Sequence, residues 1–156
     1  MDARDLERYL HDRIPLSRAM AVEVRAASPA GVILFAPLAP NINHRDTVFG
    51  GSASALAILA AWSALLVRLK DAALDGRIVI QRNTVHYERP MAAAFKASAA
   101  VPEGTSWERL LAAIHRGRPG RIRIHSVLEC DGTPSGDLEG EFVVLPPPAT
   151  APRSPA

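Results

Sequence analysis

The sequence predicts a single α+β domain in which an antiparallel sheet wraps around one long buried helix. Three observations predict this fold class. The chain has 156 residues, about the size of one domain. Residues 47–67 carry no charged side chain, which within a globular fold is typical of an enclosed helix. The strand-like segments that follow lack helical crossovers between them, so a parallel sheet is disfavoured.

Hydrophobic spacing and turn residues assign the elements in order. The first helix carries Leu6, Tyr9 and Leu10 on one side and is expected to end before Pro15. A Ser-Pro-Ala-Gly turn joins the first two strands as a hairpin. The predicted helices are 5–13, 51–71 and 106–116, and the predicted strands are 20–26, 31–36, 78–87, 94–101, 121–129 and 138–145. These segments make up a domain over residues 1–145, and the proline-rich residues 146–156 are expected to form a disordered tail.

Composition narrows the classes of partner and cofactor. The 18 basic and 16 acidic side chains leave a net charge of only +2, and aromatic residues make up 5%, which argues against nucleic-acid binding. With Cys130 as the single cysteine, neither a disulfide framework nor a zinc site is expected, and no other metal or cofactor is predicted. The charged N-terminal segment is unlike a signal peptide, so a cytoplasmic location without membrane insertion is expected.

The loop and helix start over residues 40–52 hold the densest set of reactive side chains. Two amides, an imidazole, a guanidinium and a carboxylate precede a Gly-Gly pair that opens the buried helix. The first turn of a helix has unpaired N–H groups and partial positive charge, which suit a developing oxyanion. In the alternative interpretation, Asn41 and Asn43 only shape turns and Ser52 caps the helix.

Three segments carry a family resemblance: IPLSRAMAVEV, APLAPNINHRDTVFGGS and IVIQRNTVHYERPM. They resemble a hot-dog domain family first described as thioesterases, which occurs alone or fused behind an N-acetyltransferase-like domain. Members are associated with decarboxylation of malonyl-acyl carrier protein to acetyl-acyl carrier protein, which starts fatty acid synthesis. The resemblance covers roughly residues 6–145 and implies a hot-dog fold and a homodimer with active sites at the subunit contact.

The match to hot-dog thioesterases of the phenylacetate type is partial. Those enzymes carry an Asn six positions before a His-Gly-Gly motif. Here Asn43, Gly50 and Gly51 match, while Phe49 replaces the His. Those enzymes also place an acidic residue on the central helix, but this chain has none between Gly51 and Lys70. Hydrolysis needs a base or nucleophile, whereas decarboxylation of a malonyl thioester needs stabilisation of an enolate, so the pattern favours decarboxylation.

The expected catalytic groups are the Gly51 N–H, which would hold the thioester oxygen, and the Asn43 amide, which would orient the malonyl group or share the enolate. Asn83 and Tyr87, on the strand after the buried helix, are expected either to contact the active site of the second subunit, as in hot-dog dimers, or to be ordinary strand residues. The expected substrate-binding residues are Asn41, His44, Thr47, Phe49, Gly50, Ser52, Asn83 and Tyr87.

Two other functions remain open at this point. One is a thioesterase acting on carrier-protein or coenzyme A thioesters, with His44 or Asp46 activating water. The other is a non-catalytic module that binds acyl thioesters. In either case acyl carrier protein or coenzyme A is the expected partner. Arg121 and Arg123 lie on one face of a predicted strand. This face is expected either to bind the anionic groups of that partner or to be an ordinary solvated face.

Overall fold

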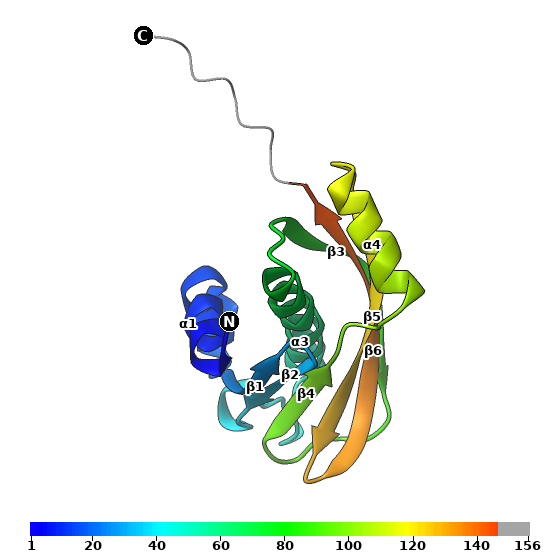
Figure 1. Cartoon of the computed structure of the whole chain (residues 1–156). Helices are drawn as coiled ribbons and strands as arrows, with labels where there is room; N and C mark the ends of the chain where they lie inside the picture. Colours follow the sequence, from blue (N-terminus) through cyan, green and yellow to red (C-terminus); the bar gives the residue numbers. More distant parts are fainter. Residues whose placement is uncertain (147–156) are drawn as a thin grey trace.

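Six antiparallel strands curve around a long central helix in a computed structural model that describes residues 1–146 (Figure 1). The predicted α+β class is therefore confirmed. The helices are α1 Ala3–Arg13, α2 Pro15–Ala19, α3 Gly50–Asp71 and α4 Thr105–His115, with a short 3₁₀ turn η1 Ala39–Asn41. The strands are β1 Glu23–Ser28, β2 Gly31–Ala36, β3 Arg77–Tyr87, β4 Phe95–Ala99, β5 Gly120–Cys130 and β6 Thr133–Leu145. Apart from Pro146, the predicted tail lies outside the described residues.

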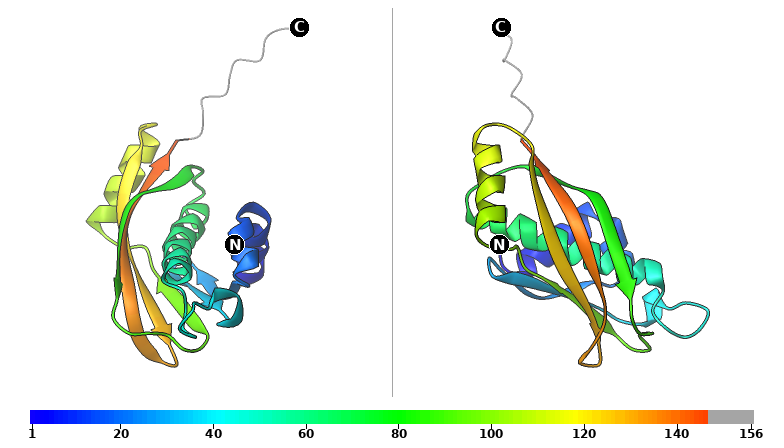
Figure 2. Two further views of the ribbon diagram at one scale, coloured as in Figure 1. Left: turned by 180° about the vertical axis from the view of Figure 1, so that it is seen from behind. Right: turned by 90° about the vertical axis from the view of Figure 1, so that its right-hand side faces the viewer.

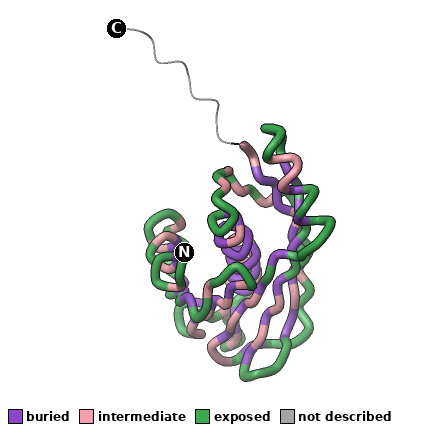
Figure 3. The backbone as a smooth tube through the Cα atoms, viewed as in Figure 1, coloured by how far each residue is buried: buried purple, intermediate pink, exposed green. Residues whose placement is uncertain are grey.

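Helix α3 is apolar on nearly every side because the sheet and the N-terminal helices enclose it (Figure 3). Its many alanines keep it slim, so the strands approach it closely, and Leu56 and Leu65 are fully buried. By length and composition α3 could cross a membrane, but 61% of its most apolar stretch is buried within this fold. That burial matches the prediction of an enclosed core helix.

The sheet has the strand order β1-β2-β4-β5-β6-β3, and all neighbours are antiparallel. Strand β3 follows α3 in the chain and pairs with β6, the final strand. It therefore lies at one edge of the sheet. Strand β6 begins at Thr133, earlier than predicted, because its first residues already pair with the end of β5. Its pairing with β3 begins at Gly136, where a Cβ would collide with the His86 carbonyl oxygen.

The N-terminal helices cover the side of α3 that faces away from the sheet (Figure 2). In α1, Leu6 and Leu10 are fully buried, and the Tyr9 ring stacks on Trp62 of α3 at a centroid distance of 6.2 Å. The prediction that strand β1 begins at Met20 is wrong. Pro15 ends α1 but starts α2, where a proline is well accommodated, and the chain enters the strand only after that helix.

Helix α4 lies beside the first half of β5, the part that has no pairing with β4 (Figure 2). Trp107 and Leu110 point into the fold from α4, and Leu110 lies directly against Gly120 at the start of β5. A Cβ at position 120 would stand 3.1 Å from the Leu110 carbonyl oxygen, so glycine permits this close contact. The helix thus covers the start of β5 from the buried side, while Arg121 and Arg123 on the outer face stay exposed.

Candidate active site

The start of α3 carries unpaired backbone N–H groups. Phe49 is the N-cap residue with extended backbone, and the first helical bond runs from the Ala53 N–H to the Phe49 carbonyl. Within residues 1–146 no side chain caps this helix, and its first turn contains no acidic residue. Ser52 lies inside the first turn and is not the cap. The N–H groups of residues 50–52 are therefore available to a negatively charged atom.

The Asn43 side chain organises the loop that leads into α3. Its Nδ2 donates to Thr47 Oγ1 at 3.0 Å and to the Val48 carbonyl at 3.3 Å. Its Oδ1 accepts from the Arg45 N–H at 2.7 Å and from the Thr47 N–H at 3.3 Å. These contacts form an Asx turn, as the alternative interpretation of the sequence expected. Both amide hydrogens are thus used within the loop, so the contacts of Asn43 are those of a positioning residue.

Asn41 is an internal anchor of the same loop and not the open substrate contact that the sequence interpretation expected. Its side chain is only 1% exposed. Nδ2 donates to the Met20 carbonyl at 3.0 Å and to the Pro37 carbonyl at 2.8 Å, while the Asn41 carbonyl accepts from the Phe49 N–H at 2.7 Å. These bonds tie the loop to the chain before β1 and fix the residue that begins α3.

Two more candidates lie at the exposed outside of the loop. His44 is exposed, and its Nε2 accepts from Arg45 Nε at 3.4 Å. Phe49 is 57% exposed, and its ring lies over Gly51, where a Cβ would collide with it. The Phe49 ring therefore shields one side of the helix start, whereas it was expected to line the acyl pocket.

Tyr87, at the end of β3, reaches the start of α3 from the opposite direction. Its hydroxyl donates to the Gly50 carbonyl at 3.0 Å, and its ring stands 3.6 Å from where a Cβ of Gly50 would lie. Strand pairing between β3 and β6 brings the tyrosine to this position. The contact closes one wall of a cavity of about 330 Å³. That cavity is lined by Thr47, Val48, Gly50, Ala53, Tyr87, Glu88, Arg89, Pro90 and Met91.

The structure thus brings Thr47, Gly50 and Tyr87 together, and it adds two charged residues that the sequence interpretation missed. Glu88 and Arg89 follow Tyr87 directly in the chain, within one of the segments that carry the family resemblance. Their position could not be inferred from spacing, because it depends on β3 pairing with the distant strand β6. Glu88, an exposed residue, adds an acidic residue to the lining of this cavity, whereas the first turn of α3 has none.

Asn83 lies apart from this cavity. It is four residues before Tyr87, roughly 13 Å along an extended strand, and it pairs with Gly140 of β6. There it borders a small surface hollow together with Arg82, Thr84, Arg123, Glu139 and Glu141. Within one protomer Asn83 does not reach the start of α3.

The arginine-bearing face of β5 is balanced by acidic residues of β6. Arg123 lies 3.8 Å from Glu139 and 3.7 Å from Glu141, and Arg121 donates to Gln81 Oε1 at 3.3 Å. This arrangement fits the solvated strand face that the sequence left open as an alternative. Exposed pairs of this kind contribute little to stability.

Asp137 of β6 joins two imidazoles on the same face. Its oxygens lie 2.8 Å from His125 Nε2 and 3.2 Å from His86 Nδ1. Partial burial raises the pKa of the Asp137 carboxyl, but the hydrogen bonds from His125 and His86 outweigh this and hold the pKa below its ordinary value of 3.8. Within residues 1–146 no group of three or more His, Cys, Asp or Glu side chains is arranged to hold a metal ion.

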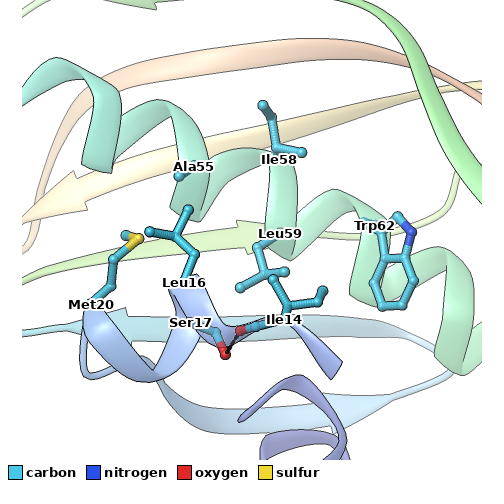
Figure 4. Close-up of a pocket in the computed structure, with 8 residues that line it drawn as sticks. All are labelled: Ile14, Leu16, Ser17, Met20, Ala55, Ile58, Leu59 and Trp62. Atoms are coloured by element: carbon cyan, nitrogen blue, oxygen red, sulfur yellow. Dashed lines mark hydrogen bonds between the residues drawn. The ribbon is translucent and has the colours of Figure 1, made fainter. Parts of the chain in front are cut away.

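A second, apolar cavity of about 280 Å³ lies between the N-terminal helices and α3 (Figure 4). It begins about one helical turn after Gly51 and continues along α3. Its one polar side chain, Ser17, donates to the Ile14 carbonyl at 2.8 Å. The cavity therefore offers an uncharged surface for an acyl chain. Its walls are Ile14, Leu16, Ser17, Met20, Ala55, Ile58, Leu59 and Trp62.

Comparison with known proteins agrees with this architecture. Residues 3–146 match a family described as "Putative thioesterase (yiiD_Cterm)". A solved structure from Shewanella oneidensis, also described as a "putative thioesterase", is 27% identical, covers 92% of this chain and 97% of that chain, and has a TM-score of 0.84.

Two more distant structures are similar in fold. A protein of unknown function from Chlorobaculum tepidum is 23% identical over 93% of this chain and 94% of that chain, with a TM-score of 0.87. A thioesterase from Haemophilus influenzae is 12% identical over 96% of this chain and 94% of that chain, with a TM-score of 0.76. Together with the family match over nearly every described residue, the sheet wrapped around α3 shows that this chain belongs to the YiiD C-terminal family of thioesterase-like hot-dog proteins.

Proposed function

We propose that this protein decarboxylates a malonyl thioester on acyl carrier protein, leaving the acetyl thioester that starts fatty acid synthesis. The observation that supports this most directly is the start of α3. Its first N–H groups have no capping side chain within residues 1–146, and Gly50 borders a cavity large enough for a small acyl group. No metal or organic cofactor is needed for this reaction.

The reaction needs a site that stabilises negative charge on one oxygen. The bond between the carboxylate carbon and the methylene carbon breaks, carbon dioxide leaves, and its electron pair forms the enolate of the thioester. The Gly51 N–H, helped by those of Gly50 and Ser52, holds the enolate oxygen. A proton from water then converts the enolate carbon into the acetyl methyl group, and the thioester bond stays intact.

The assignment of Asn43 follows from its contacts. Because both of its amide hydrogens serve Thr47 and Val48, we assign it the role of positioning the loop before Gly50. A direct bond from Asn43 to the substrate would require these loop bonds to break. Substitution of Asn43 by alanine, compared with Thr47→Val, separates the two roles.

Thioester hydrolysis is the second candidate function, and one observation favours it. Glu88 lines the cavity at the start of α3, so a carboxylate is present there to activate water even though α3 carries none before its last residue. In this reaction the Gly51 N–H would stabilise a tetrahedral oxyanion. The same site therefore supports two reactions that differ in product.

Intact-protein mass spectrometry of malonyl-acyl carrier protein incubated with the protein distinguishes them. Decarboxylation lowers the carrier mass by about 44 Da and keeps the thioester, whereas hydrolysis releases the free carrier thiol. The matched variant is Glu88→Gln, which keeps the size of the side chain. If the protein is a decarboxylase, Glu88→Gln should decarboxylate as the wild type does. If the wild type releases the carrier thiol and Glu88→Gln does not, hydrolysis depends on Glu88.

A homodimer is part of the proposal. Strand β3 is an edge strand of 11 residues, and Val79 and Tyr87 on it are 44% and 57% exposed. A long exposed edge is a template for pairing with a second copy. Such pairing would bring Asn83 toward the partner subunit and cover these side chains. Light scattering should then give twice the chain mass of 16.7 kDa, and a monomer at micromolar concentration would contradict the proposal.

A further inference from the structure

Arg89, an exposed residue, is the one arginine among the residues that line the cavity at the start of α3. This residue lies in the connection from β3 to β4, next to Tyr87, which closes the cavity wall against Gly50. The positive end of a 22-residue helix and an arginine residue therefore border the same cavity. The sequence interpretation assigned no role to Arg89.

The backbone around Arg89 is held from both sides. The N–H groups of Glu88 and Arg89 both donate to the Ser135 carbonyl of β6, at 3.0 and 3.1 Å. Two residues later, the carbonyl of the buried Met91 accepts from the Val48 N–H at 2.8 Å. The guanidinium is thus attached to a fixed segment that bridges the sheet and the loop before α3, and its starting position relative to Gly50 is set by the fold.

Arg89 forms no ion pair within residues 1–146. Other arginines in this range do, such as Arg68 with Glu103 and Arg123 with Glu139 and Glu141. Glu88 lines the same cavity but makes no ion pair with its neighbour. An unpaired guanidinium near a helix N-terminus attracts an anion, and its planar fork matches the two oxygens of a carboxylate or a phosphate.

We infer that Arg89 binds an anionic group of the thioester substrate. This inference rests on the proposed function, in which the substrate carries two such groups: the carboxylate of the malonyl group and the phosphate of the pantetheine arm. The two sources have different consequences. The carboxylate loses its negative charge when carbon dioxide leaves, so an ion pair to it would stabilise the bound substrate more than the transition state. The phosphate keeps its charge throughout, so an ion pair to it would strengthen binding of the substrate and of the transition state equally.

Calorimetric binding of four pantetheine amides tests this inference without any turnover. Their acyl group is acetyl or malonyl, each with and without the pantetheine phosphate, and an amide nitrogen replaces the thioester sulfur. At low salt, Arg89→Gln should weaken binding of the probes that carry the recognised anion by about 10- to 100-fold. A loss confined to the phosphorylated probes assigns the phosphate, and one confined to the malonyl probes assigns the carboxylate.

Arg116→Gln is the matched control, because this arginine at the end of α4 makes the same charge change away from the cavity. The inference is overturned if Arg89→Gln binds every probe as Arg116→Gln does. It is also overturned if the uncharged acetyl-pantetheine amide loses as much affinity as the others, or if the wild-type protein binds none of them. The binding measurement does not depend on turnover. If the protein does not decarboxylate the substrate, the proposed function is refuted, but the role of Arg89 in binding the anion is still decided by the four probes.

Discussion

Substitution of Asn43 by alanine tests the link between the loop and the helix start. The change removes two short hydrogen bonds, from Nδ2 to Thr47 Oγ1 at 3.0 Å and from the Arg45 N–H to Oδ1 at 2.7 Å, together with three longer ones of 3.3 Å. Counting the two short bonds at about 0.5–1.5 kcal/mol each, we expect the free energy of unfolding to fall by about 1–3 kcal/mol.

Thermal denaturation measures this loss. For a chain of this size, 1 kcal/mol corresponds to a shift in Tm of about 2–4 °C, so the Tm of Asn43→Ala should fall by about 2–12 °C. Asn83→Ala serves as the control for stability, because its side chain makes no hydrogen bond within residues 1–146. An unchanged Tm for Asn43→Ala would refute the assignment of Asn43 to the loop.

Turnover of the same variant separates positioning from direct catalysis. If the Asn43 amide also donates to the enolate, the rate should fall at least about 10²-fold. Thr47→Val keeps Asn43 but removes the hydroxyl that accepts its Nδ2 proton. If Asn43 acts only through the loop, Thr47→Val should reproduce a large part of the loss in turnover. A full rate in Asn43→Ala would exclude both roles in catalysis.

Three further predictions concern stability. Leu56→Ala should lower the free energy of unfolding by about 2–5 kcal/mol in urea denaturation, because Leu56 is fully buried in α3; a loss below 1 kcal/mol would contradict the packing described for this helix. Tyr87→Phe should cost only about 0.5–1 kcal/mol by thermal denaturation, since it removes one hydrogen bond to Gly50 from a half-exposed ring. The lowered pKa of Asp137 contributes stability that is complete above the unfolded pKa of about 4 and is lost as pH falls through the folded pKa. Acid unfolding curves of wild type and Asp137→Asn should therefore differ near neutral pH and converge once the pH falls below the folded pKa of Asp137, and curves that diverge further in acid would refute the sign.

Most of the fold could be predicted from the sequence because its patterns are local. The uncharged, alanine-rich segment after Gly50 predicts the enclosed helix α3, and alternation in β5 predicts which side chains face the core. The short helix α2 escaped prediction because Pro15 was interpreted only as a stop. The start of β6 at Thr133 escaped for a different reason, since Pro134 and Gly136 disfavour a strand, and Pro134 lies in one because it pairs with Glu129 of β5.

The candidate site was predicted only in part because much of it is assembled by the topology. The Gly50–Ser52 helix start and Thr47 are contiguous in the chain, so their proximity could be inferred from sequence. Whether an amide faces the substrate or its own loop depends on hydrogen bonds a few residues away, and for Asn43 the loop bonds prevail. Glu88 and Arg89 enter the site because β3 is held by β6, and their contribution required the sheet order.

The pairing of β3 with β6 also constrains how the protein folds as it is synthesised. Translation completes α3 and β3 long before the ribosome reaches Thr133–Leu145, the only strand that pairs with β3 within the described residues. Until then, 11 residues of β3 lack their hydrogen-bond partners, and closing the sheet must bring together segments separated by β4, α4 and β5. Such long-range pairing is slow. A nascent chain stalled before residue 133 therefore exposes an unpaired strand beside the position that the active site will occupy, which makes these truncated chains prone to aggregate.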